Sequence, residues 1–212
     1  MEIEFKYRPA DDLVADKIFE DEYISKLKLG DFFCVEMRAV YFDTLKRDLM
    51  KNKMAFRIRR EDDKSVATLK WSGGSVDGLH VREEINRVPD DEKMLAKPTI
   101  EIFRDDCKIY DKLKKTVQDR TLVPVMETNF TRKRIMLDTG RSISEFSFDS
   151  GEIIAGGKSV PICEIEIEFI DGERDDFIKL GEAVAKRYKL MPGDMSKFER
   201  GIKLLHGQRC LL

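Results

Sequence analysis

The chain has 212 residues, of which 42% are hydrophobic and 38% are charged, and its formal net charge is −2. This length and apolar content are sufficient for one domain with a buried core, and they exclude a disordered chain. The 39 Lys and Arg residues nearly balance the 41 Asp and Glu residues, which excludes a general nucleic-acid-binding surface because such a surface carries a basic excess.

Alternation of apolar and polar residues with a period of two predicts eight strands along most of the chain. They lie near residues 2–8, 32–42, 54–60, 65–71, 79–87, 123–137, 143–149 and 161–169. Turn-forming residues at 61–64, 72–74 and 138–140 separate several of them. Strands joined mainly by tight turns favour an antiparallel sheet. Eight strands are also enough for a closed barrel, with an open or two-layer sheet as the alternative.

Helices are predicted between and after these strands. One begins after Pro9, and another lies around 99–116. A third spans about 173–189, where apolar residues recur on one helical face. The last begins with Ser196 as its N-cap and runs through Leu204. The fold class predicted is therefore α+β, a closed eight-stranded antiparallel barrel with helices packed outside.

The chain shows no sign of a second domain, a targeting segment or a membrane span. No repeat or flexible linker divides it, so we predict a single domain over residues 1–212, with a helical insertion at about 90–120. The N-terminus is charged, and no apolar run approaches the roughly 20 residues of a membrane helix, so we predict a cytoplasmic protein without a membrane partner. The cysteines lack CxxC spacing and are predicted to be reduced and buried: Cys34, Cys107, Cys163 and Cys210.

The polar faces of the predicted strands carry charges that are sorted by sign. Residues i, i+2 and i+4 of a strand point to the same side of the sheet. Glu2 and Glu4 therefore share one face of the first strand, and Glu164, Glu166 and Glu168 share one face of the eighth. Carboxylates dominate the first, seventh and eighth strands, whereas cations dominate the third, fourth and sixth.

Any one of these charged faces, taken alone, is best interpreted as meeting water. Together they indicate a shared charged interior rather than a solvated surface. Carboxylates repeated in register repel one another unless cations lie between them, and unpaired buried charge is costly. We predict that the apolar faces pack outward against the helices and that the charged faces converge inside the barrel. Convergent carboxylates suit Mg²⁺ or Mn²⁺, and several Arg and Lys side chains suit a polyanion, so a metal with a polyphosphate satisfies both.

An ordered set of motifs resembles the CYTH superfamily, the triphosphate tunnel metalloenzymes. A lone Glu-x-Glu-x-Lys motif would be weak, but these motifs follow the family order over nearly the whole chain. They are Glu2–Lys6, Tyr41–Thr44, Phe56–Arg59, Thr68–Lys70, Arg82–Glu84, Asp149–Gly151, Glu164–Glu166 and Ser196–Glu199. The resemblance implies a triphosphate-binding tunnel and a divalent metal. The insertion at 90–120 is longer than the family minimum.

The resemblance also implies roles for individual residues. The implied metal ligands are Glu2, Glu4, Asp149, Glu164, Glu166 and Glu168. The implied substrate contacts are Lys6, Arg57, Arg59, Lys70, Arg82, Arg132, Arg134 and Lys197. The implied catalytic residues are Glu4, Lys6, Arg57, Arg59, Lys70 and Glu166. Glu168 lies on the same face as the other implied ligands, and the resemblance carries over to it and to Glu84 less directly than to the rest.

The function predicted is hydrolysis of a phosphoanhydride bond by a metal-dependent triphosphatase, with Mg²⁺ or Mn²⁺ as cofactor. The substrate is a small-molecule triphosphate, namely inorganic triphosphate, a nucleoside triphosphate or thiamine triphosphate. No nucleic-acid polymer is expected as a partner, and the chain is expected to be a monomer or a homodimer. Two alternatives stay open: a class IV-type adenylyl cyclase that releases pyrophosphate, and a non-catalytic polyphosphate-binding module.

Other catalytic signals in the sequence are weak. His80 and His206 accompany no nucleophile signature and are interpreted as satisfied or surface histidines. The segment Gly151–Ser159 resembles a phosphate-binding loop but is one residue too long, and a strand follows it, so it is interpreted as a turn. Tyr41–Thr44 is interpreted as closing a strand and capping the next helix.

Overall fold

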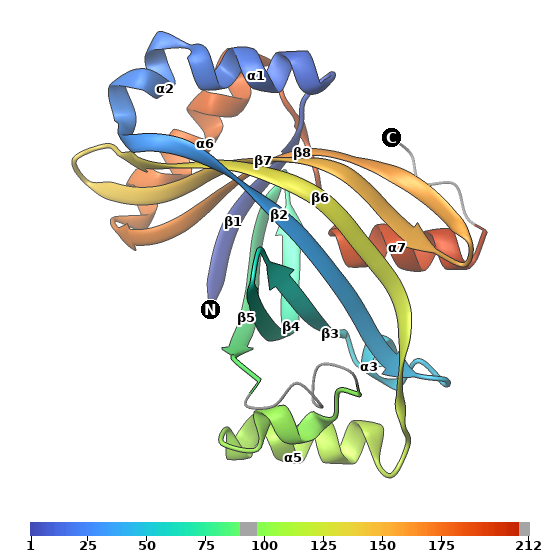
Figure 1. The fold of residues 1–212 in the computed structure, drawn as a ribbon. Coiled ribbons are helices and arrows are strands. Elements are labelled where there is room, and N and C mark those ends of the chain that lie inside the picture. Colours follow the sequence, from blue (N-terminus) through green and yellow to red (C-terminus); the bar gives the residue numbers. More distant parts are fainter. Residues whose placement is uncertain (90–96, 208–212) are drawn as a thin grey trace.

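The computed structural model describes residues 1–89 and 97–207, and its framework is a set of long antiparallel strands (Figure 1). All eight predicted strands form, and several run further than their sequence pattern. They are β1 (Glu2–Arg8), β2 (Lys28–Thr44), β3 (Met54–Glu61), β4 (Lys64–Val76), β5 (Leu79–Arg87), β6 (Leu122–Asp138), β7 (Ser142–Ala155) and β8 (Lys158–Gly172). Most of the predicted insertion at 90–120 is described, but residues 90–96 lie outside the described part.

The strands close into a barrel. Their order is β5-β4-β3-β2-β6-β7-β8-β1, and β1 also pairs with β5, which joins the two ends of the sheet. In the closing pair Glu4 lies opposite His80, and on the other side of β1 it lies opposite Glu168. A short strand, β9 (Met191–Pro192), extends the pairing beside the end of β1. The predicted closed antiparallel barrel is therefore confirmed, and the open sheet is wrong.

Helices cover the outside of the barrel and bury the apolar strand faces. Phe5, Phe146 and Ile167 pack with Phe177 in one cluster, which includes residues from three helices. These are α1 (Asp12–Glu20), α2 (Glu22–Leu27) and α6 (Arg174–Tyr188). A second cluster joins β3 and β4 to α3 (Asp48–Lys51), to the 3-10 helix η1 (Ile100–Phe103) and to α5 (Cys107–Val117). In these two clusters the apolar faces point outward, as predicted. On β2 and β6 the prediction is wrong in part, because Met37, Tyr41 and Phe130 line the interior of the barrel.

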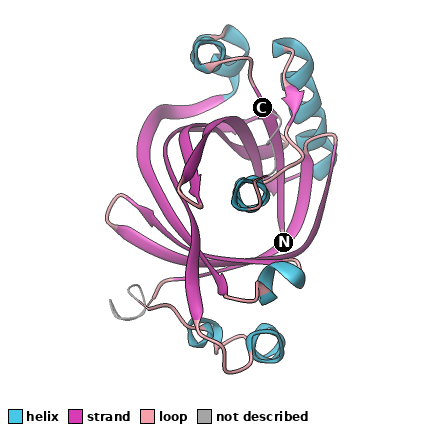
Figure 2. Cartoon of the chain, turned by 90° about the vertical axis from the view of Figure 1, so that its right-hand side faces the viewer, coloured by secondary structure: helices cyan, strands magenta, loops and turns pink. Residues whose placement is uncertain are grey.

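The last helix, α7 (Lys197–Leu205), lies within one opening of the barrel. Ser196 caps it, and Ser196 and Glu199 form the reciprocal bonds of a capping box. In Figure 2, which looks along the barrel, this helix is seen end-on within the opening. Phe198 stacks on Tyr41 of β2 with ring centroids 5.4 Å apart. Among the described residues, no helix has both the length and the apolar character needed to cross a membrane.

The structure shows the conformation of the two segments Tyr41–Thr44 and Gly151–Ser159, whose sequences resembled functional motifs. Asp43 is fully buried, and its carboxylate accepts hydrogen bonds from the backbone N–H groups of Leu49 and Met50 at the start of α3. The structural interpretation of the Tyr41–Thr44 motif is thus correct for Asp43. The segment interpreted as a turn is mostly strand: only Gly156 and Gly157, both with positive φ, form the β7–β8 turn.

The cysteine prediction is correct in one respect and wrong in another. Cys34, Cys107 and Cys163 are free, as expected. Cys34 and Cys107 are exposed, however, and Cys163 is only half-buried. Cys34 lies in the first part of β2, where every residue from 28 to 34 is exposed, so its small apolar side chain meets solvent. Cys210 lies outside the described residues.

Candidate functional site

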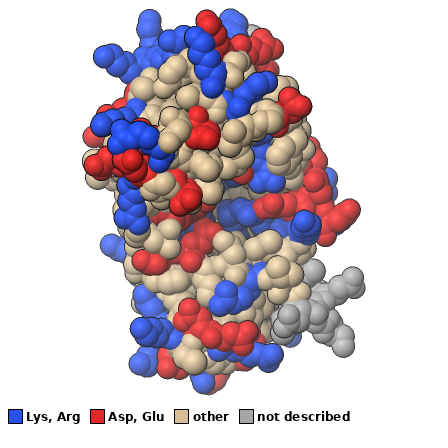
Figure 3. Space-filling model, turned by 90° about the vertical axis from the view of Figure 1, so that its left-hand side faces the viewer, with Lys and Arg blue, Asp and Glu red and all other residues tan. Residues whose placement is uncertain are grey.

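The barrel encloses a cavity of about 840 Å³ that is lined mainly by charged side chains. On the face opposite α7, Lys, Arg, Asp and Glu side chains surround a hollow (Figure 3). At the other end, side chains of α7 line the cavity. The predicted site residues on its surface are Glu2, Glu4, Lys6, Arg57, Arg59, Lys70, Arg82, Arg132, Arg134, Glu166, Glu168 and Lys197. Sequence alternation therefore placed the strand residues of this set on the correct face, whereas Lys197 enters the cavity from α7.

A first group of charges lies under α7, deep in the wall, and is fully paired. Lys197 Nζ lies 2.7 Å from Asp149 Oδ2, 3.2 Å from Glu164 Oε1 and 3.0 Å from Glu166 Oε1. Arg132 donates two hydrogen bonds of 2.7 Å to the carboxylate of Asp149 and also donates a hydrogen bond to Glu166. Each carboxylate of this group therefore faces at least one cation.

This pairing keeps the deep group ionised. Burial opposes ionisation of Glu166, but Lys197, Lys6 and Arg132 hold the pKa of this carboxyl well below its usual value. Burial likewise opposes protonation of Lys197, and the facing carboxylates Asp149, Glu164 and Glu166 raise the pKa of its ammonium group. The deep group is thus a buried ion-pair network that joins α7 to β6, β7 and β8.

A second group, formed by Glu2, Glu4 and Glu168, has three carboxylates but only two ion-paired cations among the described residues: Lys70 pairs with Glu2 and Lys6 pairs with Glu4. Burial opposes ionisation of Glu4, but Lys6 outweighs it and lowers the pKa of this carboxyl. Burial together with Glu2 and Glu4 raises the pKa of Glu168 to about 7. The pKa of Glu2 is also raised, by burial and by Glu4. Glu4 Oε1 is buried without a hydrogen-bond partner, although its other oxygen accepts from Lys6 at 3.0 Å. This part of the cavity would be stabilised by an added positive charge.

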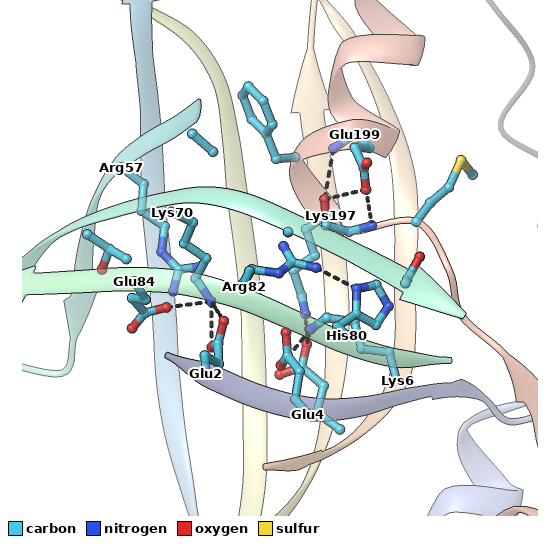
Figure 4. A pocket seen from close by; sticks show the side chains of 18 of the residues that line it. Glu2, Glu4, Lys6, Arg57, Lys70, His80, Arg82, Glu84, Lys197 and Glu199 are labelled. Carbon is cyan, nitrogen blue, oxygen red and sulfur yellow. Dashed lines mark hydrogen bonds and ion pairs between the residues drawn. The ribbon is translucent and has the colours of Figure 1, made fainter. Parts of the chain in front are cut away.

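Lys70 of β4 links the second group to Glu84 of β5, the strand that pairs with β1. Its ammonium lies 2.6 Å from Glu2 Oε1 and 2.7 Å from Glu84 Oε2, as Figure 4 shows. Burial raises the pKa of Glu84, but Lys70 and Arg57 outweigh this effect and lower the pKa to about 2. Glu84 is therefore an ionised member of the cavity wall.

The arginines on the cavity wall have hydrogen-bonding capacity that the protein does not use. The Nε groups of Arg57, Arg59, Arg82 and Arg134 are buried and have no hydrogen-bond partner among the described residues. Burial and the nearby cations Arg57 and Arg132 lower the pKa of Arg59 to about 10. Cations that crowd together with unused donors form a favourable place for a multiply charged anion.

The carboxylates of the second group fit a divalent cation in their chemistry. Mg²⁺ and Mn²⁺ take carboxylate oxygens, and Glu4 Oε1 is a buried acceptor without a donor. Among residues 1–89 and 97–207, however, no three His, Cys, Asp or Glu side chains are already arranged to hold a metal. Asp149, Glu164 and Glu166, also predicted as ligands, are occupied by the ion pairs of the deep group. The six-residue ligand set stays a prediction.

Tyr41 and His80 are among the cavity residues that were not predicted from the sequence as part of the site. Tyr41 was given only a structural role, yet it lines the cavity, and its hydroxyl accepts a hydrogen bond of 3.3 Å from Arg57. His80 was interpreted as a satisfied histidine, which it is, but it also lines the cavity. The alternation of β5 places His80 on the face of Arg82, so this signal was available in the sequence.

The fold and the cavity define a class of protein: a closed antiparallel barrel whose interior carries both carboxylates and cations. The CYTH domain matches residues 1–202, and the chain belongs to the CYTH family. An inorganic triphosphatase of Haemophilus influenzae is 33% identical over 183 residues, which are 86% of this chain and 50% of that protein. The chain therefore spans about half the length of this curated relative.

Solved structures share the fold. HpAC1 from Hippeastrum, described as having a dominant triphosphatase activity, is 21% identical and has a TM-score of 0.69, with 99% of this chain and 98% of that chain covered. The PH1819 protein of Pyrococcus horikoshii is 20% identical with a TM-score of 0.56, covering 98% of this chain and all of that chain. At these identities the similarity establishes the barrel architecture alone.

Proposed function

We propose that this protein hydrolyses a phosphoanhydride bond of a small triphosphate with the help of Mg²⁺ or Mn²⁺. One observation carries the proposal: cations with unused donors and carboxylates short of cations line the same enclosed cavity. A phosphate chain together with a divalent cation satisfies both groups. The curated relative, an inorganic triphosphatase, supports the same chemistry.

The arginines and the ion-paired residues of the cavity have different roles in this proposal. Arg57, Arg59, Arg82 and Arg134 line the cavity and bind phosphate oxygens through their guanidinium groups. In the reaction they stabilise the charge that develops on the transferred phosphoryl group, where positioning and electrostatics dominate. The paired carboxylates and cations around Lys70 hold the wall rigid, so little reorganisation accompanies the chemical step.

Glu2, Glu4 and Glu168 are the residues that would hold the metal. When bound there, a divalent cation neutralises phosphate charge and lowers the pKa of a bound water molecule. Burial together with Glu2 and Glu4 raises the pKa of Glu168 to about 7, which supports its place among these three residues. Asp149, Glu164 and Glu166 keep α7 in place through Lys197, and they remain candidate ligands only if α7 moves.

Product analysis tests the proposal. The protein is incubated with inorganic triphosphate, ATP or thiamine triphosphate, each with Mg²⁺, with Mn²⁺ or with a chelator alone. Release of orthophosphate that depends on the metal is the expected result. Cyclic AMP with pyrophosphate would identify a cyclase instead, and triphosphate binding without turnover would identify a binding module.

A further inference from the structure

His80 of β5 uses both of its ring nitrogens, on two different parts of the site. Its side chain is 1% exposed. Nε2 lies 2.8 Å from the carbonyl oxygen of Gly193, and Nδ1 lies 2.5 Å from Nη2 of Arg82. A carbonyl only accepts and a guanidinium only donates, so Nε2 carries the hydrogen and Nδ1 is bare. This arrangement requires one neutral tautomer.

On the Nδ1 side, His80 is the group that fixes the head of Arg82. No carboxylate of the described residues lies within ion-pairing distance of Arg82, unlike Arg132 or Lys197. Arg82 Nε is buried and has no hydrogen-bond partner within residues 1–89 and 97–207. The base of the side chain is held by Gly73 of β4, where an added Cβ would lie 2.4 Å from Arg82 Cβ. Figure 4 shows the guanidinium between the carboxylates of β1 and the His80 ring.

On the Nε2 side, His80 holds the segment that leads into α7. Gly193 N–H donates to the carbonyl of Lys6 at 2.9 Å, so this segment is also tied to β1. The next residue, Asp194, accepts from the backbone of Gly78 through Oδ1 at 2.9 Å. Lys197, the cation that enters the deep group, follows three residues later. His80 therefore connects the Arg82 guanidinium to the start of the helix that closes the cavity.

We propose that His80 is a positioning residue that orients Arg82 toward the bound phosphate chain through Nδ1, while Nε2 locks the ring to the segment before α7. The proposal rests on the proposed function, because it assumes that Arg82 binds substrate. Without the Nδ1 contact the Arg82 head would sample several rotamers, and triphosphate would bind to the fraction that points correctly. Loss of a hydrogen bond to a charged group corresponds to roughly a tenfold rise in KM.

Two polar substitutions separate the two contacts. In His80→Asn the amide oxygen is as many bonds from Cβ as Nδ1, so it can still accept from Arg82. In His80→Gln the amide nitrogen is as many bonds from Cβ as Nε2, so it can still donate to Gly193. We expect KM for the turned-over triphosphate to stay within about twofold of wild type in His80→Asn and to rise roughly tenfold in His80→Gln, with kcat changing less.

A double-mutant cycle excludes a purely structural role. In an Arg82→Ala background, His80→Gln should change KM by less than about twofold, because the group that it positions is gone. His206→Gln, at the exposed end of α7, is the matched control and should leave KM unchanged. Equal KM values in His80→Asn and His80→Gln, or multiplicative effects in the double variant, would overturn the proposal.

A binding readout keeps this inference distinct from the proposed function. If the wild-type protein releases no phosphate, the proposed function fails, and the same variants are compared by the rise in Tm that inorganic triphosphate causes. The expected order is then wild type close to His80→Asn and above His80→Gln. If the wild-type protein releases phosphate or binds triphosphate but the variants do not follow the expected order, the positioning role of His80 is refuted and the proposed function is not. A wild-type protein that neither hydrolyses nor binds triphosphate refutes both.

Discussion

Replacing Lys197 by Met tests whether the deep ion-pair network holds α7 on the barrel. The substitution keeps the length of a 7% exposed side chain and removes its charge. Asp149, Glu164 and Glu166 then lose a partner that lies 2.7, 3.2 and 3.0 Å away, respectively. Removing one member of a buried pair costs about 3–5 kcal/mol, and the remaining contacts of Arg132 and Lys6 favour the lower figure.

A loss of about 3 kcal/mol corresponds to a fall in Tm of roughly 6–12 °C for a domain of this size. Thermal unfolding of the metal-free protein measures it. Lys203→Met is the matched control, because Lys203 lies on the same helix and no described carboxylate pairs with it. A Lys197→Met protein that melts within about 2 °C of the Lys203→Met protein would refute the assignment of a stabilising role to this network.

The destabilisation of Lys197→Met relative to wild type is expected to depend on pH. The folded-state pKa of Glu166 lies below its unfolded value, so its ion pairs contribute stability above the unfolded pKa of 4.5 and lose it as the pH falls through the folded pKa. The difference in stability between wild type and Lys197→Met should therefore be largest near pH 7 and should narrow below about pH 4.5. If the stability difference between wild type and Lys197→Met stayed constant from pH 7 to below pH 4.5, the lost charge of Lys197 would not be the cause of the destabilisation.

Three further substitutions test the cavity and its walls. Glu4→Gln should lower turnover by on the order of 10²-fold or more while far-UV circular dichroism stays unchanged, and near-normal rates would remove Glu4 from the metal site. Arg57→Ala should weaken substrate capture, seen as a raised KM in a phosphate-release assay, and unchanged kinetic constants would exclude it as a phosphate contact. Gly181→Ala should destabilise the protein by about 1–3 kcal/mol in urea, because the new Cβ would lie 2.3 Å from the Phe5 ring; an unchanged midpoint would contradict this packing.

The sequence by itself determined the strands and their two faces. A period of two is a local property, so Glu2, Glu4 and Lys6 could be placed on one face without knowledge of their neighbours. The strand count favoured a closed barrel and the sorted charges predicted a charged interior; the ordered motifs imply the same, and the structure confirms both. Strand ends were less well predicted: β7 runs to Ala155 because pairing with β8 continues until Gly156 and Gly157 turn the chain.

Only the tertiary structure decided which charges meet. Glu166 and Glu168 look equivalent in the sequence, yet Lys197 pairs with the first, and the second has a pKa raised to about 7. The difference arises from the register of β8 against β1 and from the placement of α7, which join residues far apart in the chain. The contact between His80 and Gly193 depends on the same long-range closure. Alternation assigns a side chain to a face, whereas its ionisation and its partner follow from the three-dimensional packing around it.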